Sequence, residues 1–392
     1  MGLSLTSREQ SMFDGEAGEA ARESMEILVA LGEIYGAARM VPVTSVQVSG
    51  VSYKTIGQAG LDYLNGLAAK GAKVRVPAFL NPAGMDSSQW KEMRIPEDFA
   101  KKQIEVLDAY ARMGISKTCT CAPYFIGIRP KRGEHVAWAE SSAVAFANSV
   151  LGARTNREGG PSALAAAICG VTPYYGLHLE KNRVANLVVN VRCPLRTVAD
   201  FGALGSAVGK TAKNRYPAFH GIKSATEPQL KVLGASMAAT GSVPIFFIEG
   251  ITPEYTIAEK PDIISITEKE LAAERKAIDS GLKPNLVTIG CPHASLDEIR
   301  DVAELVAKRR PTCEFWVCTS RKLKEEADRL GYGGIISAAG GRVVADTCMV
   351  VCPLEEMGYM VTGTDSGKAA AYLPNLCKQK VAFGDLEDIL YR

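Results

Sequence analysis

The segment PNLVTIGCPHASLDEIRDVAELVAKRRPTCEFWVCTSRKLKEEADRLGYGGIISAAGGRVVADTCMVV, residues 284–351, indicates the fold class of this chain. It contains three apolar runs that predict strands, PNLVTIG (284–290), EFWVCTS (314–320) and GGRVVADTCMVV (340–351). Charged segments that favour helices lie between them, at 296–310 and 322–330. This β-α-β-α-β order predicts a parallel sheet with right-handed crossover connections.

The helix expected at 296–310 carries signals at both of its ends. Ser295 is a suitable N-cap, because its hydroxyl can accept a hydrogen bond from the first turn. Asp297 and Glu298 fall in that first turn, and the basic run KRR (308–310) falls in the last. The helix dipole favours both placements, so local sequence agrees with the apolar pattern.

Four reactive or polar side chains lie at or near the ends of the predicted strands: Cys291, Ser320, Arg321 and Cys348. Parallel strands place their carboxyl ends along one edge of the sheet, and ligands of open α/β sheets bind beyond that edge. We therefore expect these side chains, distant in sequence, to converge on one site.

The remaining sequence continues the α/β pattern without an internal repeat. Strands are expected at 41–50, 73–82, 117–125, 184–191 and 242–250, and helices at 8–35, 60–71, 97–114, 139–151, 161–169 and 267–280. A chain of 392 residues exceeds what one hydrophobic core usually serves, so we expect multi-layer α/β subdomains with parallel sheets. The Gly-, Pro- and Lys-rich stretch 209–228 predicts a boundary between an N-terminal part, 1–220, and a C-terminal part, 221–392.

The composition is ordinary for a globular enzyme, with 47% hydrophobic and 22% charged residues. The formal net charge is +2, so overall charge predicts binding neither to nucleic acid nor to an anionic membrane. The N-terminus lacks an apolar core of signal-peptide length, and no apolar run is long enough for a transmembrane helix. We therefore expect a cytoplasmic protein, and the balanced charge leaves small anionic substrates open, because a local basic pocket needs only a few residues.

Ten cysteines are a high number for a chain without a signal peptide. A disulfide framework is not expected, which leaves core thiols, metal or cluster ligands, or a nucleophile. Cys121, Cys291 and Cys348 each lie beside small, Pro or Thr residues in predicted loops, and three thiolates can hold an iron–sulfur cluster. Spacing alone favours buried core thiols, since no compact Cys-x-x-Cys run is present, and the core interpretation also suits Cys169, Cys193, Cys313, Cys318 and Cys377.

Two glycine-rich segments resemble phosphate-binding loops without matching the motif. GALGSAVGKT (202–211) has three residues between Gly205 and Gly209, where the motif requires four. SGK (366–368) lacks the Ser or Thr that follows the lysine. A nucleoside-triphosphate site is therefore disfavoured, and turns that bind a smaller anion through amides or lysine suit these segments better.

Two arginines are candidates for holding an acidic ligand. The loop ARTNREGGP (153–161) contains Arg154, and Arg321 follows a predicted strand. Arginine can grip a carboxylate or phosphate through two parallel hydrogen bonds. Either arginine could equally belong to a solvated loop, and the residues alone leave this choice open.

Taken together, these motifs resemble the aconitase X family. The matching segments span nearly the whole chain in order: SGVSYKTIGQAGLDYL (49–64), CTCAPY (119–124), AESSAVAFANSVLGARTNREGGPSAL (139–164), TPYYGLHL (172–179), GALGSAVG (202–209), IGCPHASLDEI (289–299), CTSR (318–321), ADTC (345–348) and SGKAAAYLP (366–374). Each segment alone is weakly specific, whereas the combination is highly specific. The resemblance implies an aconitase-like α/β fold with a cluster site between its subdomains.

The resemblance also implies a reaction and a partner. Dehydratases of this family act on cis-3-hydroxy-L-proline in bacteria and on (R)-5-phosphomevalonate in archaea. Cys291 resembles the archaeal pattern, because fused bacterial members tend to have serine there. We therefore expect a hydro-lyase that forms trans-anhydromevalonate 5-phosphate in a modified mevalonate pathway towards isoprenoids. This chain would be the large subunit of a heterodimer with a separate small swivelling-domain subunit.

For the cofactor, the resemblance implies a [4Fe-4S] cluster held by Cys121, Cys291 and Cys348, with one iron open to act as a Lewis acid. Cys119 is an alternative to its neighbour Cys121. Another class of function stays open from the sequence: a non-catalytic binding subunit that kept the fold and lost the cluster.

The resemblance further implies which residues contact substrate. His293, Ser320 and Arg321 are expected in the catalytic centre, where His293 either protonates the leaving group or holds the loop of Cys291. The base would come from the partner subunit. Further substrate contacts are expected from Ser49, Gly50, Ser52, Ser142, Arg154, Thr155, Asn156, Glu158, Ser366 and Lys368.

Overall fold

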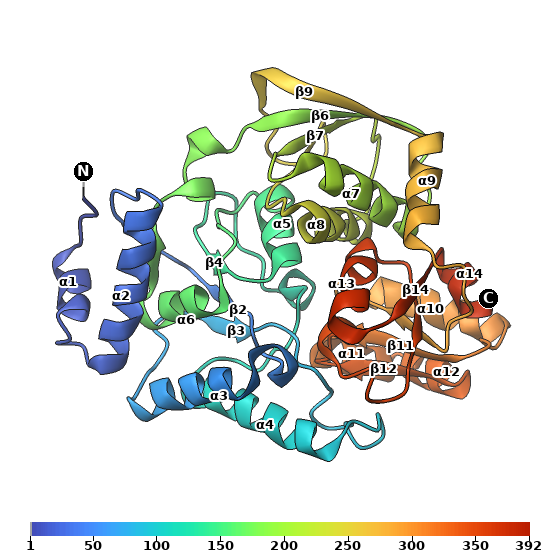
Figure 1. The fold of residues 1–392 in the computed structure, drawn as a ribbon, viewed down its shortest axis with the longest axis horizontal. Helices are drawn as coiled ribbons and strands as arrows, with labels where there is room; N and C mark the ends of the chain where they lie inside the picture. The colour runs from blue at the N-terminus through green and yellow to red at the C-terminus, as the bar shows by residue number, and fades with distance from the viewer. Residues whose placement is uncertain (1) are drawn as a thin grey trace.

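The computed structural model describes residues 2–392, which form three α/β regions, each built around its own sheet (Figure 1). These main sheets have three, four and five strands in chain order. All pairings within them are parallel, which confirms the predicted parallel α/β class. No helix in residues 2–392 has the length and apolarity needed to cross a membrane.

The N-terminal region has the sheet order β3-β2-β4, formed by Ala78–Leu80, Val46–Val48 and Ala137–Trp138. A separate antiparallel pair joins β1 (Met40–Pro42) to β5 (Val171–Pro173). The helices of this region are α1 (Ser7–Phe13), α2 (Glu19–Ile34), α3 (Tyr53–Ala69), α4 (Glu97–Arg112), α5 (Ser141–Ser149) and α6 (Gly160–Cys169). Figure 1 shows α3 and α4 below this sheet and α2 with α6 on its other side, and these layers share one apolar core.

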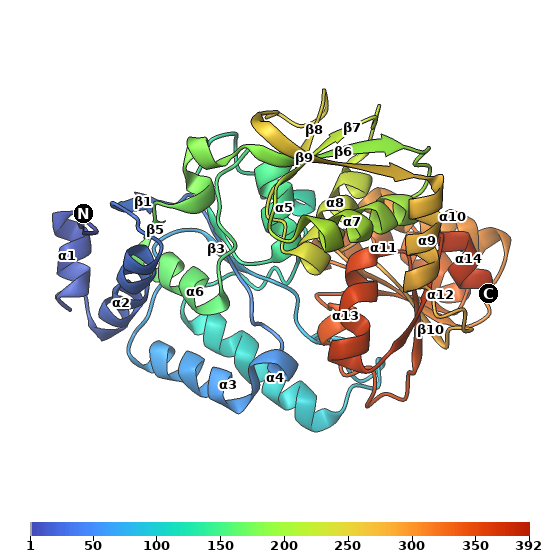
Figure 2. The ribbon, with the colours of Figure 1, turned by 45° about the horizontal axis from the view of Figure 1, so that its top comes forward.

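The middle region has the sheet order β8-β7-β6-β9, formed by Phe247–Ile248, Pro217–His220, Ala185–Arg192 and Ile257–Thr267. Helices α7 (Val198–Ala212) and α8 (Glu227–Gly241) lie side by side beneath it, as Figure 2 shows. Helix α9 (Glu268–Ile278) follows β9 and leads into the C-terminal region.

The C-terminal region has the sheet order β12-β11-β10-β13-β14, formed by Gly341–Ala345, Glu314–Thr319, Leu286–Ile289, Val361–Thr364 and Lys380–Phe383. Its helices are α10 (Leu296–Lys308), α11 (Arg321–Arg329), α12 (Tyr332–Ala338), α13 (Gly367–Cys377) and α14 (Leu386–Tyr391). The first three strands form the predicted β-α-β-α-β unit, and Ser295 caps α10 as predicted. Strand order reverses between β10 and β13, the position at which such sheets bind ligands.

Two strand predictions are wrong. Segment 117–125 is irregular and ends in a short 3₁₀ helix. The apolar run 242–250 contributes only the two residues of β8, because side chains of α5 satisfy its backbone instead of a neighbouring strand. Ser149 Oγ accepts from the Phe246 N–H at 2.8 Å, and Asn148 Nδ2 donates to Pro244 O at 3.0 Å.

The glycine-rich segment 202–211 is also not the anion-binding turn that we expected, because it lies inside α7. Its glycines let α7 approach its neighbours closely. A Cβ on Gly205 would lie 2.6 Å from Leu233 O of α8, and one on Gly209 would lie 2.1 Å from Thr240 Oγ1. The motif therefore serves packing between helices, and its amides are occupied by the helix itself.

The tight contact between α7 and α8 predicts that Gly205→Ala destabilises the fold by about 1–3 kcal/mol, because the added methyl group meets backbone of α8. Gly66→Ala is the matched control, since no atom lies within 4 Å of its added Cβ and alanine favours helix α3 by about 0.5–1 kcal/mol. Urea denaturation of both variants measures the difference. A Gly205→Ala protein as stable as the parent would contradict the packing role.

Candidate functional site

Loops from two distant regions of the chain meet beside the C-terminal sheet. Cys291 follows β10, Cys348 follows β12, and Cys121 lies in a loop of the N-terminal region. Backbone hydrogen bonds join the regions: Ala83 N–H donates to Asp346 O at 2.8 Å, and Cys348 N–H donates to Ala83 O at 3.0 Å. These contacts bring the loop of Cys348 against a segment far from it in sequence.

His293 fastens these loops to one another. Its backbone N–H donates to Cys121 Sγ at 3.2 Å, and its Nε2 donates to Thr347 O at 2.9 Å. A carbonyl oxygen can only accept, so Nδ1, 3.1 Å from Thr120 Oγ1, is the acceptor of the pair. Burial lowers the pKa of His293 to about 4, which keeps the ring neutral. With both nitrogens engaged, the contacts fit a residue that holds the loop of Cys291 better than a proton donor.

The thiols of Cys121 and Cys348 lie near that of Cys291, and the thiol of Cys318, at the end of β11, also lies near Cys121 and Cys291. Burial raises the pKa of Cys121 to about 12 and also raises the pKa of Cys291 and Cys348. The positive charge of Lys368 favours the thiolate form and therefore opposes this rise in pKa for these three thiols. Cys119 stands apart, because its charged neighbours are Asp346, Lys117 and Arg321 and its side chain belongs to the N-terminal core.

Lys368 extends from α13 towards the three thiols and is almost fully buried. Its Nζ forms an ion pair with Glu140 and lies 3.3 Å from Ser142 Oγ. Asn81 Nδ2 donates to the other carboxylate oxygen of Glu140 at 2.7 Å. Burial alone would raise the pKa of Glu140, but the charge and hydrogen bond of Lys368 outweigh it and bring the pKa to about 2. Sequence reasoning included Ser142 and Lys368 but missed Glu140, whose only signal was its N-cap position before α5.

Ser366 immediately precedes the same helix. Its hydroxyl accepts from Ala369 N–H at 3.1 Å as the N-cap of α13 and also opposes the rise in the pKa of Cys291. The segment 366–368 is thus a helix start beside the thiols.

A second buried lysine, Lys231 of α8, supports the site from behind. Its Nζ donates to His293 O at 3.1 Å and to the two carboxylate oxygens of Glu298 at 2.9 and 2.6 Å. An ammonium group has three donors, so Lys231 is saturated by these contacts, whereas Lys368 retains donor capacity. The hydrogen bonds of Lys231 therefore support the His293 loop, whereas Lys368 is the lysine that can still donate to a ligand.

Arg321 and Ser320 lie at the start of α11, next to the loop of Cys348. Arg321 Nη2 lies 2.5 Å from Asp86 Oδ1 and 2.6 Å from Asp346 Oδ2, and its Nε donates to Asp346 at 3.2 Å. Burial raises the pKa of Asp346 to about 6, whereas contacts with Arg321 and Ser88 bring that of Asp86 below its usual value despite burial. Ser320 Oγ accepts from Leu323 N–H at 3.2 Å and caps the helix.

Some buried polar atoms without a hydrogen-bond partner belong to residues that contact Glu140 or the loop of Cys121. Within residues 2–392 these include Asn81 Oδ1, Gln47 Oε1 and the Tyr124 hydroxyl. Gln47 contacts the loop directly, because its Nε2 donates to Thr120 O at 3.0 Å. An unpaired buried polar atom costs roughly 1–3 kcal/mol, so such atoms mark places where a ligand or water completes the site.

The donor set is compatible with a thiolate-held cluster and less so with a single metal ion. No three His, Cys, Asp or Glu side chains in residues 2–392 are placed to hold one ion. An iron–sulfur core distributes its thiolates over several iron atoms, so the sulfurs need not meet at a point. Loop thiols near one another, an N–H donor to the sulfur of Cys121 and the nearby charge of Lys368 suit such a core.

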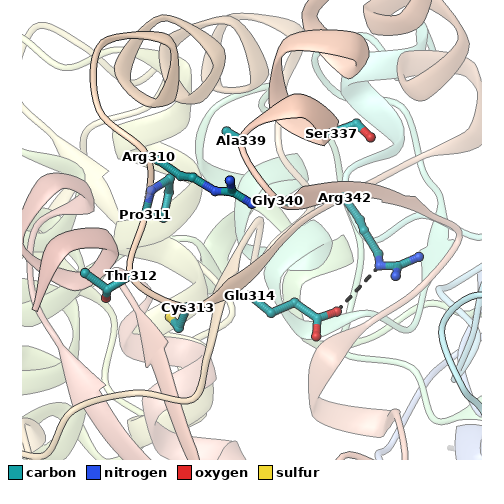
Figure 3. A pocket seen from close by; sticks show the side chains of 10 residues that line it. Arg310, Pro311, Thr312, Cys313, Glu314, Ser337, Ala339, Gly340 and Arg342 are labelled. Carbon is teal, nitrogen blue, oxygen red and sulfur yellow. Dashed lines mark ion pairs between the residues drawn. The ribbon is translucent and has the colours of Figure 1, made fainter.

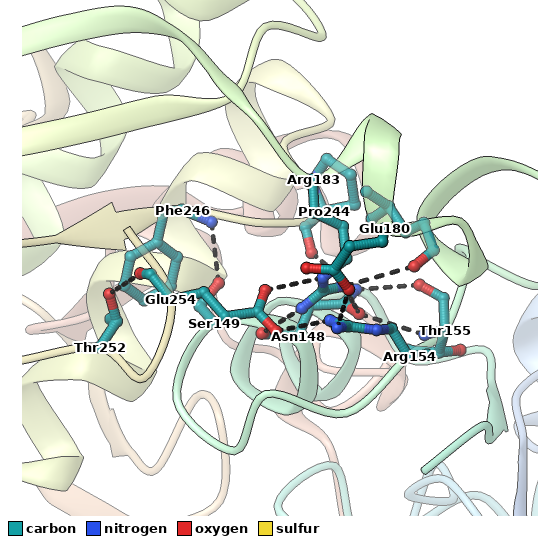
Figure 4. Close-up of polar contacts among 11 residues, drawn as sticks. Asn148, Ser149, Arg154, Thr155, Glu180, Arg183, Pro244, Phe246, Thr252 and Glu254 are labelled. Carbon is teal, nitrogen blue, oxygen red and sulfur yellow. Dashed lines mark hydrogen bonds and ion pairs between the residues drawn. The ribbon is translucent and has the colours of Figure 1, made fainter. Parts of the chain in front are cut away.

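The structure places Arg154 in a different buried network, shown in Figure 4. Its Nη1 lies 2.6 Å from Glu254 Oε1, and its Nη2 forms an ion pair with Glu180. Arg183 shares Glu254, with Nε 2.8 Å from Oε2, and donates to Asn148 O at 2.9 Å. These contacts tie together the middle and N-terminal regions, and both terminal nitrogens of Arg154 are occupied.

The other three predicted residues of this loop, Thr155, Asn156 and Glu158, are likewise engaged in structural contacts. Thr155 N–H donates to Asn148 Oδ1 at 3.1 Å, and Asn156 Oδ1 accepts from Leu177 N–H at 2.8 Å. Glu158 accepts from Ser162 Oγ at 2.6 Å and from Thr172 Oγ1 at 3.0 Å. None of these contacts is shared with the thiols.

The N-terminal candidates lie near the loop of Cys348 or in a small apolar cavity. Ser52 Oγ donates to Val351 O at 2.9 Å, three residues after Cys348. Ser49 and Gly50 instead line a cavity of about 100 Å³ with Tyr63, Tyr110, Leu64 and Leu164.

Comparison with known proteins matches the whole length of this chain. Family models described as aconitase X first domain, second domain and third domain match residues 2–181, 185–276 and 284–392. A protein of Methanothermobacter thermautotrophicus named phosphomevalonate dehydratase large subunit is 52% identical over 98% of both chains. The cis-3-hydroxy-L-proline dehydratase of Pseudomonas aeruginosa is 33% identical over 98% of this chain and 69% of its own.

A solved structure matches the fold closely. The crystal structure of Thermococcus kodakaraensis aconitase X, in its holo-form, is similar with a TM-score of 0.93. The two chains are 45% identical, and the match covers 99% of each.

Beside the Arg154 network, His135 and His178 predict a pH dependence of stability. Their Nδ1 atoms lie 2.9 Å apart, and burial, His135 and the nearby arginines lower the pKa of His178 to about 3. An unfolded histidine takes up its proton near pH 6.5, so the stabilising contribution is complete above that pH and is lost as pH falls towards 3.

We expect the unfolding free energy to fall by up to about 1.4 kcal/mol per pH unit from this residue, and His178→Gln to remove that part of the slope between about pH 6.5 and 4.5. His220→Gln, on the sheet of the middle region, is the control and should keep the slope. Chemical denaturation at a series of pH values measures it. An unchanged slope in His178→Gln would refute the assignment.

Proposed function

Because this chain belongs to the aconitase X family, we propose that it is the large subunit of a dehydratase that converts (R)-5-phosphomevalonate to trans-anhydromevalonate 5-phosphate. The observation that carries the proposal is the 52% identity, over 98% of both chains, to a protein named phosphomevalonate dehydratase large subunit. The relative named cis-3-hydroxy-L-proline dehydratase is more distant, at 33% identity. The hydroxyproline reaction is therefore the second candidate.

The cofactor of the proposed enzyme is a [4Fe-4S] cluster held by Cys121, Cys291 and Cys348. When bound, such a cluster supplies a Lewis acid that polarises the leaving hydroxyl group. The support is the position of Cys291 and Cys348 in loops that follow β10 and β12, the His293 N–H that donates to Cys121 Sγ, and the separate location of Cys119, whereas Cys318 lies within β11.

Lys368 is the proposed anchor for an acidic group of the substrate. It is buried beside the thiols, its charge acts on all three, and it can donate a further hydrogen bond beyond Glu140 and Ser142. Arg321 is the proposed second anchor, because its Nη1 makes no contact within residues 2–392 while Nε and Nη2 are fixed by Asp86 and Asp346. A fixed guanidinium presents its free donor at little entropic cost.

His293 is proposed to position the loop of Cys291, and the proton-abstracting base is proposed to come from a small swivelling-domain subunit. Within residues 2–392, the titratable side chains that contact the thiol loops are all engaged: Glu140 is an ion-paired carboxylate, Asp346 is paired with Arg321, and both nitrogens of His293 have partners. This chain covers 69% of the Pseudomonas relative, so that relative has residues beyond the match that could form such a domain.

The cluster assignment predicts that Cys121→Ala, Cys291→Ala and Cys348→Ala each lower bound iron and acid-labile sulfide by at least roughly tenfold, since even residues that only orient metal ligands contribute that much to affinity. Cys119→Ala is the matched control, a buried thiol in the same loop, and should keep the iron. Iron and sulfide analysis of anaerobically purified protein gives the result, and circular dichroism checks folding.

A full iron complement in Cys291→Ala would end the cluster proposal. Loss of iron in Cys119→Ala but not in Cys121→Ala would transfer the third ligand to Cys119.

The substrate assignment predicts turnover of phosphomevalonate, and none of cis-3-hydroxy-L-proline, by the chain purified anaerobically with its small partner. Product is measured by nuclear magnetic resonance, and each subunit alone serves as the control and should be inactive. Turnover of the proline alone would replace the proposed substrate with the second candidate. Activity of this chain without a partner would contradict the proposed origin of the base.

A further inference from the structure

The C-terminal sheet has a cavity at its amino edge, opposite the edge that carries the thiols. It measures about 530 Å³ and lies where β11 and β12 begin. Figure 3 shows Arg310 and Arg342 on its walls, with Glu314 below them and the turn at Gly340 between them. Thr312 and Ser337 also line this cavity, which we call the amino-edge cavity.

The amino-edge cavity carries excess positive charge. Arg310 has no hydrogen bond or ion pair within residues 2–392, and Arg342 Nε lies 3.5 Å from Glu314 Oε1. Glu314 is already neutralised by Arg94, whose Nη2 lies 2.9 Å from its Oε2, and it accepts from the Tyr359 hydroxyl at 2.8 Å. These contacts and that of Trp316 outweigh burial and hold the pKa of Glu314 below its usual value, so this carboxylate is shared by Arg94 and Arg342 and leaves Arg310 without a partner in residues 2–392.

The carboxyl ends of two helices lie at this edge, and their partial negative charge reduces the positive charge of the arginines without cancelling it. Helices α10 and α12 both end here, and each carbonyl end carries roughly half a negative charge. Both ends are partly satisfied, because the Tyr391 hydroxyl donates to Leu305 O and Arg309 O, and Gly340 N–H donates to Ser337 O. Three arginines, one carboxylate and two half charges leave a net charge of about +1.

We infer that the amino-edge cavity binds the phosphate or diphosphate group of a small molecule. Planar guanidinium groups match the oxygens of such groups, and an unpaired Arg310 with a weakly paired Arg342 can turn to them without losing a strong contact. The hydroxyls of Thr312 and Ser337 add donors. This site is separate from the thiols and does not depend on the proposed reaction.

The test is isothermal titration of the anaerobically purified chain, with its partner, by inorganic pyrophosphate at low ionic strength. We expect one site that is weakened at least about tenfold by Arg310→Ala and by Arg342→Ala, since each removes a charge-assisted hydrogen bond. Arg329→Ala is the matched control, because Arg329 is an exposed arginine already paired with Glu326 on α11, and should bind as the parent does.

A second readout places the ligand in this cavity. Cys313 lines it and is partly exposed, so pyrophosphate should slow alkylation of Cys313 in the parent and leave it unchanged in the double variant Arg310→Ala, Arg342→Ala. Three results would each overturn the inference: no binding at millimolar pyrophosphate, equal binding by the double variant, or equal weakening by Arg329→Ala.

Discussion

The candidate site depends above all on His293 and the hydrogen bonds that surround it. Loops near positions 120, 291 and 347 come from different parts of the chain, and ordering them together costs conformational entropy that local structure cannot recover. His293 meets this cost with three contacts, to Cys121, Thr120 and Thr347, and Lys231 holds its carbonyl oxygen from behind. Its neutral ring suits this purpose, because a charged imidazole would require a further partner in a buried position.

Two buried lysines show how charge is distributed around that centre. Burying an ammonium group costs several kcal/mol, which a pairing carboxylate only offsets, so a buried ion pair is weak evidence for stability. Lys231 uses all its donors within the fold and stiffens the His293 loop. Lys368 keeps a donor in reserve beside the thiols, where its attraction is enhanced by the low local dielectric. Similar residues thus have different roles, and only their hydrogen-bond inventories distinguish them.

The sequence was sufficient for features that follow from periodicity and chain direction. The β-α-β-α-β unit follows from alternating apolar runs, and the convergence of Cys291 with Cys348 follows from the common carboxyl edge of parallel strands. The role of a side chain could not be predicted from the sequence where it depends on a contact with a residue distant in the chain. Glu140 reads as a helix cap until Lys368 is seen beside it, and Arg154 reads as a ligand contact until Glu254 and Glu180 occupy it. Strand β9 was not predicted, because its charged residues and Pro261 interrupt the apolar pattern; such residues are tolerated in an edge strand.

The same parallel sheet creates different electrostatic conditions at its two edges. At the carboxyl edge, the loops of Cys121 and Cys348 close over the strand ends, so charges act on one another across protein with little screening. At the amino edge, Arg310 and Arg342 face solvent, and salt screens their field within about 10 Å. A buried site can attract a charged ligand with few rigidly held charges, whereas a solvent-exposed site needs several charges of the same sign. The arginines gathered around Glu314 satisfy the second condition, just as the single Lys368 among the thiols satisfies the first.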